Sequence, residues 1–270
     1  MKIMLITDAW HPQVNGVVRT LTRVIEEAEA MGHVFEVVSP SDGFKTIPLP
    51  TYSEIQLAVG ARKQIEERFH AFEPEAVHIA TEGTLGMAGR SMCLKNGMPF
   101  TTSYHTRFPE YVSARFPVPV SWGYGFMKWF HRYSGHIMVA TASMREELEE
   151  RGFGNVVAWS RGVDTELFHP SKRENMPDPF AGMERPIFLN VGRVAVEKNI
   201  EAFVELDLPG TKVVVGDGPQ KEELEKKYKK VKFLGAKFGD ELASCFAHAD
   251  VFVFPSLTDT FGLVILEAMA

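Results

Sequence analysis

Residues 187–199, IFLNVGRVAVEKN, decide the fold class of this chain. They begin with a short apolar run, Ile187–Val191, which is typical of a strand buried on both faces. A glycine and two cations follow, and a helical pattern begins near residue 199. The same order of strand, loop and helix recurs before and after this stretch. Strands that alternate with helices form parallel sheets covered on both faces, so the sequence predicts an α/β protein.

The alternation falls into two halves, separated by a polar, proline-rich stretch. We therefore predict a first domain at residues 1–169, a linker at 170–186 and a second domain at 187–270. Each domain is expected to be doubly wound and Rossmann-like, and the two to face each other across a cleft that holds ligands at the carboxyl ends of strands. The second half has only four strand patterns, and its last helix pattern reaches residue 270 without a glycine cap. We expect the second domain to be incomplete.

The sequence also predicts the local structure of four segments. Residues 39–52 contain several prolines and are predicted to form a loop, and residues 53–72 are predicted to form a helix. The segment around Pro109 and Pro117 is predicted to be irregular. The run Ser143–Glu146 has the pattern of a capping box and is predicted to open a helix.

The composition excludes several classes of protein. The chain has 270 residues, 45% of them hydrophobic, which excludes a disordered chain and a small disulfide scaffold. It has 29 basic and 35 acidic residues, so its net charge is −6 and we expect no nucleic-acid partner. Cys93 and Cys245 are far apart and are expected to be buried rather than to bind metal. The sequence lacks a membrane-spanning apolar run and a secretory signal, so we expect a cytoplasmic protein.

Asn15 and Gly16 stand between the first strand pattern and the next helix pattern. A glycine at a helix start lets an anion approach backbone N–H groups at the positive end of the helix dipole. A phosphate fits such a site, and an ordinary turn is the alternative interpretation.

Gly192, Arg193 and Lys198 lie between a strand end and a helix start in the second half. Two fixed cations at this place suit a diphosphate, above all one that must leave during a reaction. The alternative is a pair of solvated surface cations. The next strand pattern ends in a second glycine-rich turn, Gly216–Pro219, which serves either a ligand or the turn itself.

Asp259 and Glu267 stand eight positions apart, with Gly262 at a helix start between them. Carboxylates accept hydrogen bonds from the hydroxyls of a sugar or a ribose. The alternative is an aspartate at the helix dipole and a surface glutamate, but the apolar neighbours of Glu267 argue against simple solvation. His105 follows the strand pattern of residues 100–104, where an imidazole either bonds a sugar hydroxyl or serves the structure.

Together these motifs resemble the retaining, nucleotide-sugar-dependent glycosyltransferases of family 4, which have the GT-B fold. The resemblance extends along the whole chain, and its short runs look closest to bacterial mannosyl-, glucosyl- and sulfoquinovosyltransferase-like members. It rests on these motifs in order: Asn15-Gly16, Tyr104-His105-Thr106, Arg161-Gly162-Val163-Asp164 with Phe168, Val191-Gly192-Arg193 with Lys198, Gly216–Pro219 and Asp259–Ala270.

The resemblance assigns five residues to the phosphates of the donor. Gly16 would offer its backbone near the donor phosphate and the acceptor. Arg193 and Lys198 would hold the diphosphate and stabilise it as the leaving group, beside Gly192 and Gly216. Because these cations replace Mg²⁺, the resemblance implies neither a metal nor a cofactor.

Five further residues are assigned to the sugar and the nucleoside. His105 would contact the hexose near its anomeric carbon, and Glu267 would bind the donor ribose, in a donor site that includes Phe261 and Gly262. Asp259 stands where the family has a glutamate that faces the hexose hydroxyls. The aspartate is shorter by about 1.5 Å, which leaves the hexose preference open.

The implied reaction moves a hexose from a donor of the GDP-mannose or UDP-glucose type to a hydroxyl of a sugar or lipid-linked acceptor. A nucleotide-sugar-binding fragment without activity is one alternative, and a sugar-nucleotide epimerase of the same fold is another. The aromatic and cationic segment 121–133 has two interpretations. It is either a peripheral contact with the inner face of the membrane or a core helix of the first domain.

Overall fold

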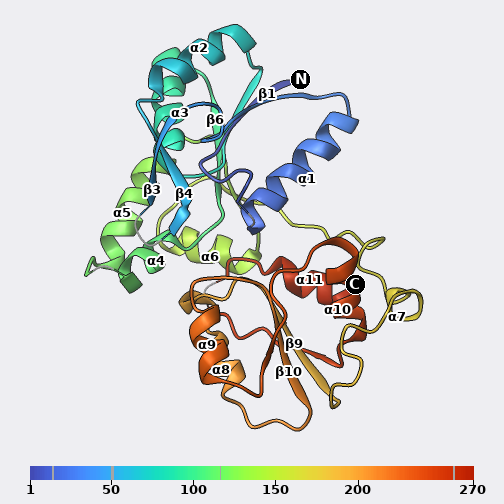
Figure 1. The fold of residues 1–270 in the computed structure, drawn as a ribbon. Coiled ribbons are helices and arrows are strands. Elements are labelled where there is room, and N and C mark those ends of the chain that lie inside the picture. Colours follow the sequence, from blue (N-terminus) through green and yellow to red (C-terminus); the bar gives the residue numbers. More distant parts are fainter. Residues whose placement is uncertain (14, 50–51, 116, 258) are drawn as a thin grey trace. The chain divides into compact units, whose positions relative to one another are not determined.

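A computed structural model describes residues 1–13, 15–49, 52–115, 117–257 and 259–270. The chain forms two compact units, Met1–Ser160 and Arg161–Ala270, each built around a parallel sheet (Figure 1). The first unit thus ends nine residues before the predicted domain boundary at 169.

The first unit is built on six strands in the order β2-β1-β5-β6-β7-β8, and each described pair of neighbours is parallel. This arrangement confirms the doubly wound prediction for this half. The strands are β1 (Lys2–Ile6), β2 (Val34–Val38), β5 (Ala76–Ile79), β6 (Phe100–Tyr104), β7 (Ile137–Val139) and β8 (Val156–Ala158). The helices are α1 (Gly16–Ala30), α2 (Arg62–Phe72), α3 (Thr84–Asn96), α4 (Phe108–Arg115), α5 (Val120–His131) and α6 (Ala142–Glu150).

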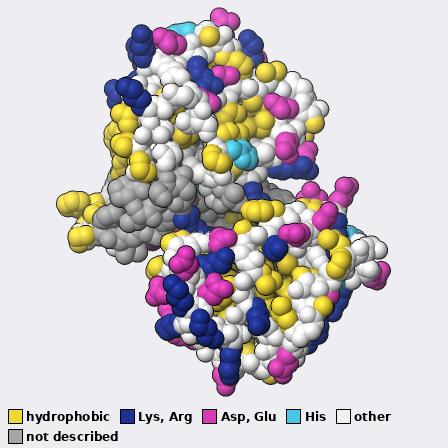
Figure 2. Space-filling model, in the orientation of Figure 1, with side chains coloured by type: hydrophobic (Ala, Val, Ile, Leu, Met, Phe, Trp, Pro, Cys, Tyr) yellow, Lys and Arg dark blue, Asp and Glu magenta, His cyan; other side chains and the backbone are white. Residues whose placement is uncertain are grey.

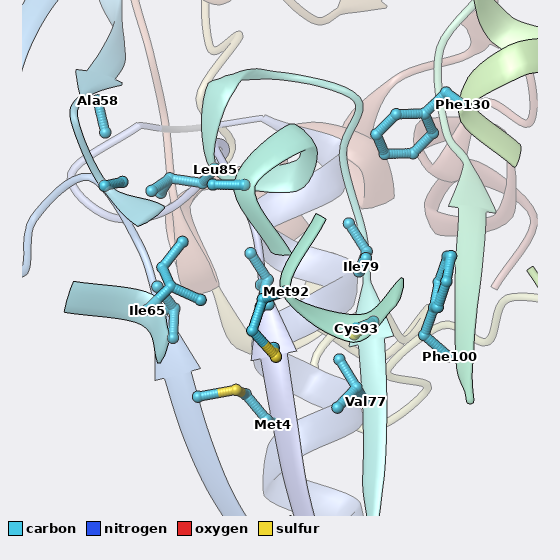
Figure 3. Close-up of a cluster of buried hydrophobic side chains, with 14 residues drawn as sticks. Met4, Ala58, Ile65, Val77, Ile79, Leu85, Met92, Cys93, Phe100 and Phe130 are labelled. Carbon is cyan, nitrogen blue, oxygen red and sulfur yellow. The ribbon is translucent and has the colours of Figure 1, made fainter. Parts of the chain in front are cut away.

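Apolar side chains of α3 pack onto the sheet and form a core of this unit (Figure 3). Leu85 and Met92 come from the helix, and Met4 and Ile79 face them from the sheet. Cys93 lies in the same cluster, as predicted, and burial raises the pKa of its thiol to about 12. A thiol in such surroundings stays protonated and is chemically inert.

A two-stranded hairpin replaces the predicted loop and the first part of the predicted helix. Strand β3 (Lys45–Leu49) pairs antiparallel with β4 (Tyr52–Val59), and α2 begins only at Arg62. Gly60, with a φ of 72°, separates the strand from the helix. The predictions of a loop at 39–52 and a helix at 53–72 are therefore wrong over these strands. Pro48 suited a loop, but a strand of a two-stranded hairpin tolerates a missing N–H.

Two other local predictions need correction. The segment predicted to be irregular contains α4, because Pro109 is its second residue, where a missing N–H breaks no helical hydrogen bond. Helix α6 is capped by Thr141 rather than Ser143, and the Thr141 side chain accepts a hydrogen bond from the backbone N–H of Met144.

The second unit is built on four parallel strands, as predicted, and the structure places them in the order β11-β10-β9-β12. The strands are β9 (Ile187–Val191), β10 (Thr211–Val215), β11 (Lys232–Phe233) and β12 (Val251–Phe252). The helices are α7 (Lys172–Asn175), the 3-10 helix η1 (Val196–Lys198), α8 (Ile200–Val204), α9 (Lys221–Lys227), α10 (Gly239–His248) and α11 (Leu263–Met269). Cys245 is buried in a core of this unit, as predicted.

The stretch predicted to be a linker, residues 170–186, packs onto the second sheet. Phe180 is fully buried in the core beneath β9. Arg185 forms ion pairs with Asp178 at 2.9 Å and with Asp250 at 2.8 Å. The charges of this segment pair with each other, with Asp240 of α10 and with Asp250 just before β12. Sequence spacing does not show these pairs, so the segment looked like a solvated linker.

Candidate functional site

The strand order of the second unit defines a switch point between β9 and β12. Numbered within this unit, the strands follow the order 3-2-1-4, so the chain moves outward from β9 to β10 and β11 and then returns to place β12 on the other side of β9. Ligands of such sheets bind at this point, beyond the carboxyl ends of the strands. The loop after β9 carries Gly192, Arg193 and Lys198, and the loop after β12 carries Asp259. Topology thus brings together candidates that are far apart in the sequence.

Side-chain contacts join these two loops. Lys198 Nζ lies 2.5 Å from Asp259 Oδ1, and the two side chains are 25% and 20% exposed. Asn199 donates a hydrogen bond from Nδ2 to the carbonyl of Pro255 at 3.1 Å. The second carboxylate oxygen of Asp259 is buried and has no hydrogen-bond partner among the described residues. The pair therefore leaves an acceptor oxygen available at the switch point. Thr258, which precedes Asp259, lies outside the described residues.

Gly216 and Gly192 lie at this edge of the sheet, and each needs to be a glycine for a different reason. A Cβ on Gly216 would lie 1.9 Å from the carbonyl oxygen of Gly192, because the loops after β9 and β10 run against each other. Gly216 is thus required by loop packing, whatever its part in binding. A Cβ on Gly192, whose φ is 151°, would meet no atom within 4 Å. The open space at Gly192 permits a ligand to approach the backbone there.

The remaining candidates of this unit lie around α11. Gly262, with a φ of 78°, precedes the first residue of the helix, and Phe261 is half-buried beside it. Glu267 is only 4% exposed and lies one turn into α11. Its burial confirms that it is not a simple surface glutamate. Arg193, two residues beyond β9, is half-buried.

The first unit has its own switch point, between β1 and β5. Its strands follow the order 2-1-3-4-5-6 when numbered within the unit. Asp8, just beyond β1, is 5% exposed and accepts hydrogen bonds from the backbone N–H groups of Leu85 at 2.9 Å and Gly86 at 3.3 Å. It also accepts one from Thr81 Oγ1 at 2.9 Å. Burial raises the pKa of Asp8, although these hydrogen bonds oppose the shift. This carboxylate holds the amino end of α3.

Gly16 and His105 also lie at the carboxyl edge of the first sheet. Gly16 is the first residue of α1. The Asn15 side chain accepts hydrogen bonds from the backbone N–H groups of Val17 and Val18, both at 3.0 Å. His105 follows β6 directly, and its ring lies 5.7 Å from that of Trp159. The sequence prediction that both stand after strand ends is confirmed, and both belong to the first unit.

Sequence reasoning missed a second carboxylate at this edge. Glu82 lies on the loop from β5 to α3, and His131, the last residue of α5, faces it at 3.3 Å. The signal in the sequence was a polar residue three positions after a strand. His131 was noted only as one cation of an aromatic helix, because nothing in the spacing joins the two residues.

No cluster of three or more histidine, cysteine, aspartate or glutamate side chains with the arrangement of a metal site occurs among the described residues. Within the same described ranges, none of the helices combines the length and the apolar character needed to cross a bilayer.

Two family models match the chain. The model described as "Glycosyltransferase Family 4" matches residues 14–167, and the model described as "Glycosyl transferases group 1" matches residues 185–270. The first covers more than half of the chain.

Curated relatives match over most or all of the chain. A protein named GDP-mannose-dependent alpha-mannosyltransferase from Mycobacterium tuberculosis is 28% identical over 100% of this chain and 77% of its own length. Sulfoquinovosyl transferase SQD2 from Arabidopsis thaliana is 31% identical over 84% of this chain and 47% of its own length. An alpha-monoglucosyldiacylglycerol synthase from Acholeplasma laidlawii is 26% identical over 100% of this chain and 78% of its own length.

Solved structures share the fold. Sucrose-phosphate synthase from Thermosynechococcus elongatus superposes with a TM-score of 0.76 at 21% identity, over 99% of this chain and 78% of that one. The Anabaena protein HepE, whose structure contains UDP, superposes with a TM-score of 0.70 at 16% identity over 100% of this chain and 78% of that one. At such identities the likeness concerns the fold alone.

Proposed function

Because this chain belongs to glycosyltransferase family 4, we propose that it transfers a hexose from a nucleotide-diphosphate sugar to a hydroxyl acceptor, with retention of anomeric configuration. The observation that carries the proposal is the contact of Lys198 with Asp259 at the switch point of the second sheet. A cation for the diphosphate and a carboxylate for the sugar hydroxyls meet where an open α/β sheet binds its ligand.

The donor site uses the loops that the contacts join. Lys198 and Arg193 hold the diphosphate and stabilise the charge that develops on it as the hexose leaves. Asp259 turns its unsatisfied oxygen to the hexose hydroxyls, and Glu267 binds the ribose. The two cations take the place of Mg²⁺, so EDTA should leave turnover unchanged.

We propose GDP-mannose as the donor. Three relatives that match 100% of this chain carry the name GDP-mannose-dependent alpha-mannosyltransferase. UDP-glucose is the second candidate, because the relatives named monoglucosyldiacylglycerol synthase also match the whole chain. The shorter side chain of Asp259 affects the hexose contact and does not distinguish the bases.

We propose a lipid acceptor reached by peripheral contact with an anionic membrane on the cytoplasmic side. Relatives include a synthase named for diacylglycerol and a transferase named for phosphatidylinositol dimannoside. Helix α5 buries Tyr124 and Phe130, yet Trp122 is 72% exposed and Trp129 is 45% exposed. The Arg90 guanidinium lies 4.2 Å from the Trp129 ring centroid. One face of the helix therefore belongs to the core, and the two exposed indole rings on the other face support the proposed membrane contact.

On the face drawn in Figure 2, cationic and acidic side chains of the second unit are interspersed rather than gathered by sign.

Vesicle flotation tests the membrane contact. Vesicles containing phosphatidylglycerol should float the wild-type chain, and the double variant Trp122→Ala/Trp129→Ala should bind less. Phe238→Ala removes a similarly exposed aromatic ring, 60% exposed, from the second unit and should have no effect.

Thermal unfolding with nucleotides tests the donor site. GDP at about a hundred times its dissociation constant should add roughly 2.7 kcal/mol to the free energy of unfolding. UDP and ADP should add less. Lys198→Ala should abolish the effect, whereas Lys227→Ala, which breaks an exposed pair with Glu201 of the same 2.5 Å length, should retain it. No stabilisation by any of the three nucleotides would refute the proposal.

Transfer assays distinguish the alternatives. GDP-mannose and UDP-glucose are supplied with dioleoylglycerol in phosphatidylglycerol vesicles, with phosphatidylinositol vesicles and with methyl α-mannoside. A labelled glycolipid or glycoside supports the transferase. Nucleotide binding with no product supports the inactive fragment, and an epimerised donor formed without acceptor supports the epimerase.

A further inference from the structure

A buried chain of polar side chains runs beneath the carboxyl edge of the first sheet. His131 Nδ1 lies 2.8 Å from Thr102 Oγ1, and Thr102 Oγ1 lies 3.0 Å from Ser134 Oγ. Ser134 Oγ lies 2.5 Å from the carbonyl oxygen of His136. At the other end, His131 Nε2 lies 3.3 Å from Glu82 Oε1. None of these groups is accounted for by the donor site.

The direction of each hydrogen bond in this chain is fixed by proton counting. A carbonyl only accepts, so the single hydroxyl proton of Ser134 goes to His136. Thr102 must then donate its own proton to Ser134. Thr102 has no proton left for the imidazole, so it accepts from His131, and His131 Nδ1 carries a proton.

The proton on Nδ1 determines what faces Glu82. A neutral imidazole with Nδ1 protonated would turn the lone pair of Nε2 towards the Glu82 carboxylate. The His131 side chain is 1% exposed and the Glu82 side chain 13%, so water cannot screen that repulsion. Buried charges persist where they are paired. A proton between Nε2 and Glu82 Oε1 relieves the repulsion. Because an imidazole is more basic than a carboxylate, the proton resides on Nε2, and His131 pairs with Glu82 as a cation.

The pair stands at the place where the first sheet is expected to bind a ligand. Glu82 lies on the loop after β5, one of the two loops at the switch point between β1 and β5. The neighbouring residue, Thr81, bonds Asp8 of the other loop through both the backbone N–H and the carboxylate of Asp8. The Asp8 carboxylate already accepts hydrogen bonds from Thr81 and from the amino end of α3. Among the described residues of these two loops, Glu82 is therefore the carboxylate that can still accept a hydrogen bond from a ligand.

We propose that Glu82 accepts a hydrogen bond from a hydroxyl of the glycosyl acceptor, and that His131 is a positioning residue which holds the Glu82 carboxylate ionised and oriented. The inference rests on the proposed function, because it assigns the acceptor to this edge. It adds a specificity contact to the transferase and no covalent step.

Nitrogen NMR of histidine-labelled protein tests the pairing directly. His131 is assigned by comparison with His131→Asn. At neutral pH both ring nitrogens of His131 should show protonated shifts in the wild type. In Glu82→Gln, Nε2 should shift to the unprotonated range. An unprotonated Nε2 in the wild type would overturn the inference.

Acceptor kinetics test the contact. With the best acceptor among dioleoylglycerol, phosphatidylinositol and methyl α-mannoside, Glu82→Gln should raise the acceptor KM about tenfold, in keeping with one lost charge-assisted hydrogen bond. The Kd for GDP should not change. His131→Asn should raise the same KM, and Glu82→Asp should restore part of the loss. Glu73→Gln and His70→Asn, on the exposed end of α2, are the matched controls.

The outcomes separate this inference from the proposed function. No stabilisation by any nucleotide, or no transfer to any of the three acceptors, refutes the proposed function and the contact with it. Intact GDP binding and transfer, with an unchanged acceptor KM in Glu82→Gln, overturns the contact alone.

Discussion

Each unit places an aspartate in a loop at its switch point, and the two units use it differently. Asp259 of the second unit pairs with the terminal amine of a lysine and is one-fifth exposed. Asp8 of the first unit is 5% exposed and accepts hydrogen bonds from the backbone of α3 and from Thr81. The partners decide the difference, because side-chain pairs can exchange for a ligand and backbone groups of a helix cannot. A carboxylate at a switch point is thus a binding candidate only when its partners can be replaced.

The largest effect should come from Asp8→Ala. This change leaves the buried N–H groups of Leu85 and Gly86 without an acceptor, and each such group costs roughly 1–3 kcal/mol. We expect the free energy of unfolding in urea to fall by about 3–5 kcal/mol. At a temperature where the variant is folded, its Kd for GDP should equal that of the wild type. Loss of GDP binding by the folded variant would show that Asp8 is a ligand residue as well.

The second effect concerns Lys198→Ala. Removing a charge that stabilises the leaving diphosphate should raise the barrier to transfer by about 2–4 kcal/mol, measured as kcat/KM. The free energy of unfolding should change less than in Asp8→Ala, because this variant removes one ion pair and leaves no buried backbone N–H group without an acceptor. A double-mutant cycle with Asp259→Ala measures the coupling of the pair. Wild-type turnover in Lys198→Ala would remove the contrast between the two switch points.

A smaller effect is expected for Gly216→Ala. The new Cβ would lie 1.9 Å from the carbonyl oxygen of Gly192, at a φ of 145°, so the loop after β9 must move. We expect a loss of about 1–3 kcal/mol in stability, together with weaker GDP binding, because the same loop carries Lys198. Gly182→Ala is a control that also has a positive φ but an open site. Stability loss without any change in Kd would show that the Gly192 loop shifts without affecting the donor.

The sequence predicted the second unit more fully than the first. Gly192, Lys198 and Asp259 follow strand ends in the sequence, and strand order alone brings their loops together. The Lys198–Asp259 pair itself could not be predicted, because the sequence does not give the order of strands in a sheet. The hairpin β3–β4 was not predicted, because prolines in this part of the sequence are typical of a loop. In the sequence, the helical pattern of α2 also begins before Arg62, so the strand β4 was predicted to be part of the helix.

The first unit was harder to predict because its functional candidates depend on burial. Glu82 and His131 are 49 positions apart and meet only through the packing of α5 on the sheet. The aromatic and cationic character of α5 was correctly predicted, but its periodicity does not tell which face the sheet covers. The prediction that segment 170–186 is a linker rested on its charges, but these charges form ion pairs with residues elsewhere in the second unit.

The smallest predicted effect is a pH dependence of stability that comes from Asp8. Burial raises the pKa of Asp8 above its ordinary value of 3.8, so the folded state binds its proton more tightly than the unfolded state. Wild-type stability, compared with that of Asp8→Asn, should therefore increase as pH falls from the raised pKa towards 3.8, by about 1.4 kcal/mol for each pH unit that separates these two values. Urea unfolding of both proteins at several pH values measures this difference, and acid effects common to both cancel. Asp259→Asn provides the matched comparison at the other switch point. A difference that decreases as pH falls would mean that the hydrogen bonds from α3 outweigh burial, and that Asp8 stabilises the fold most in its ionised form.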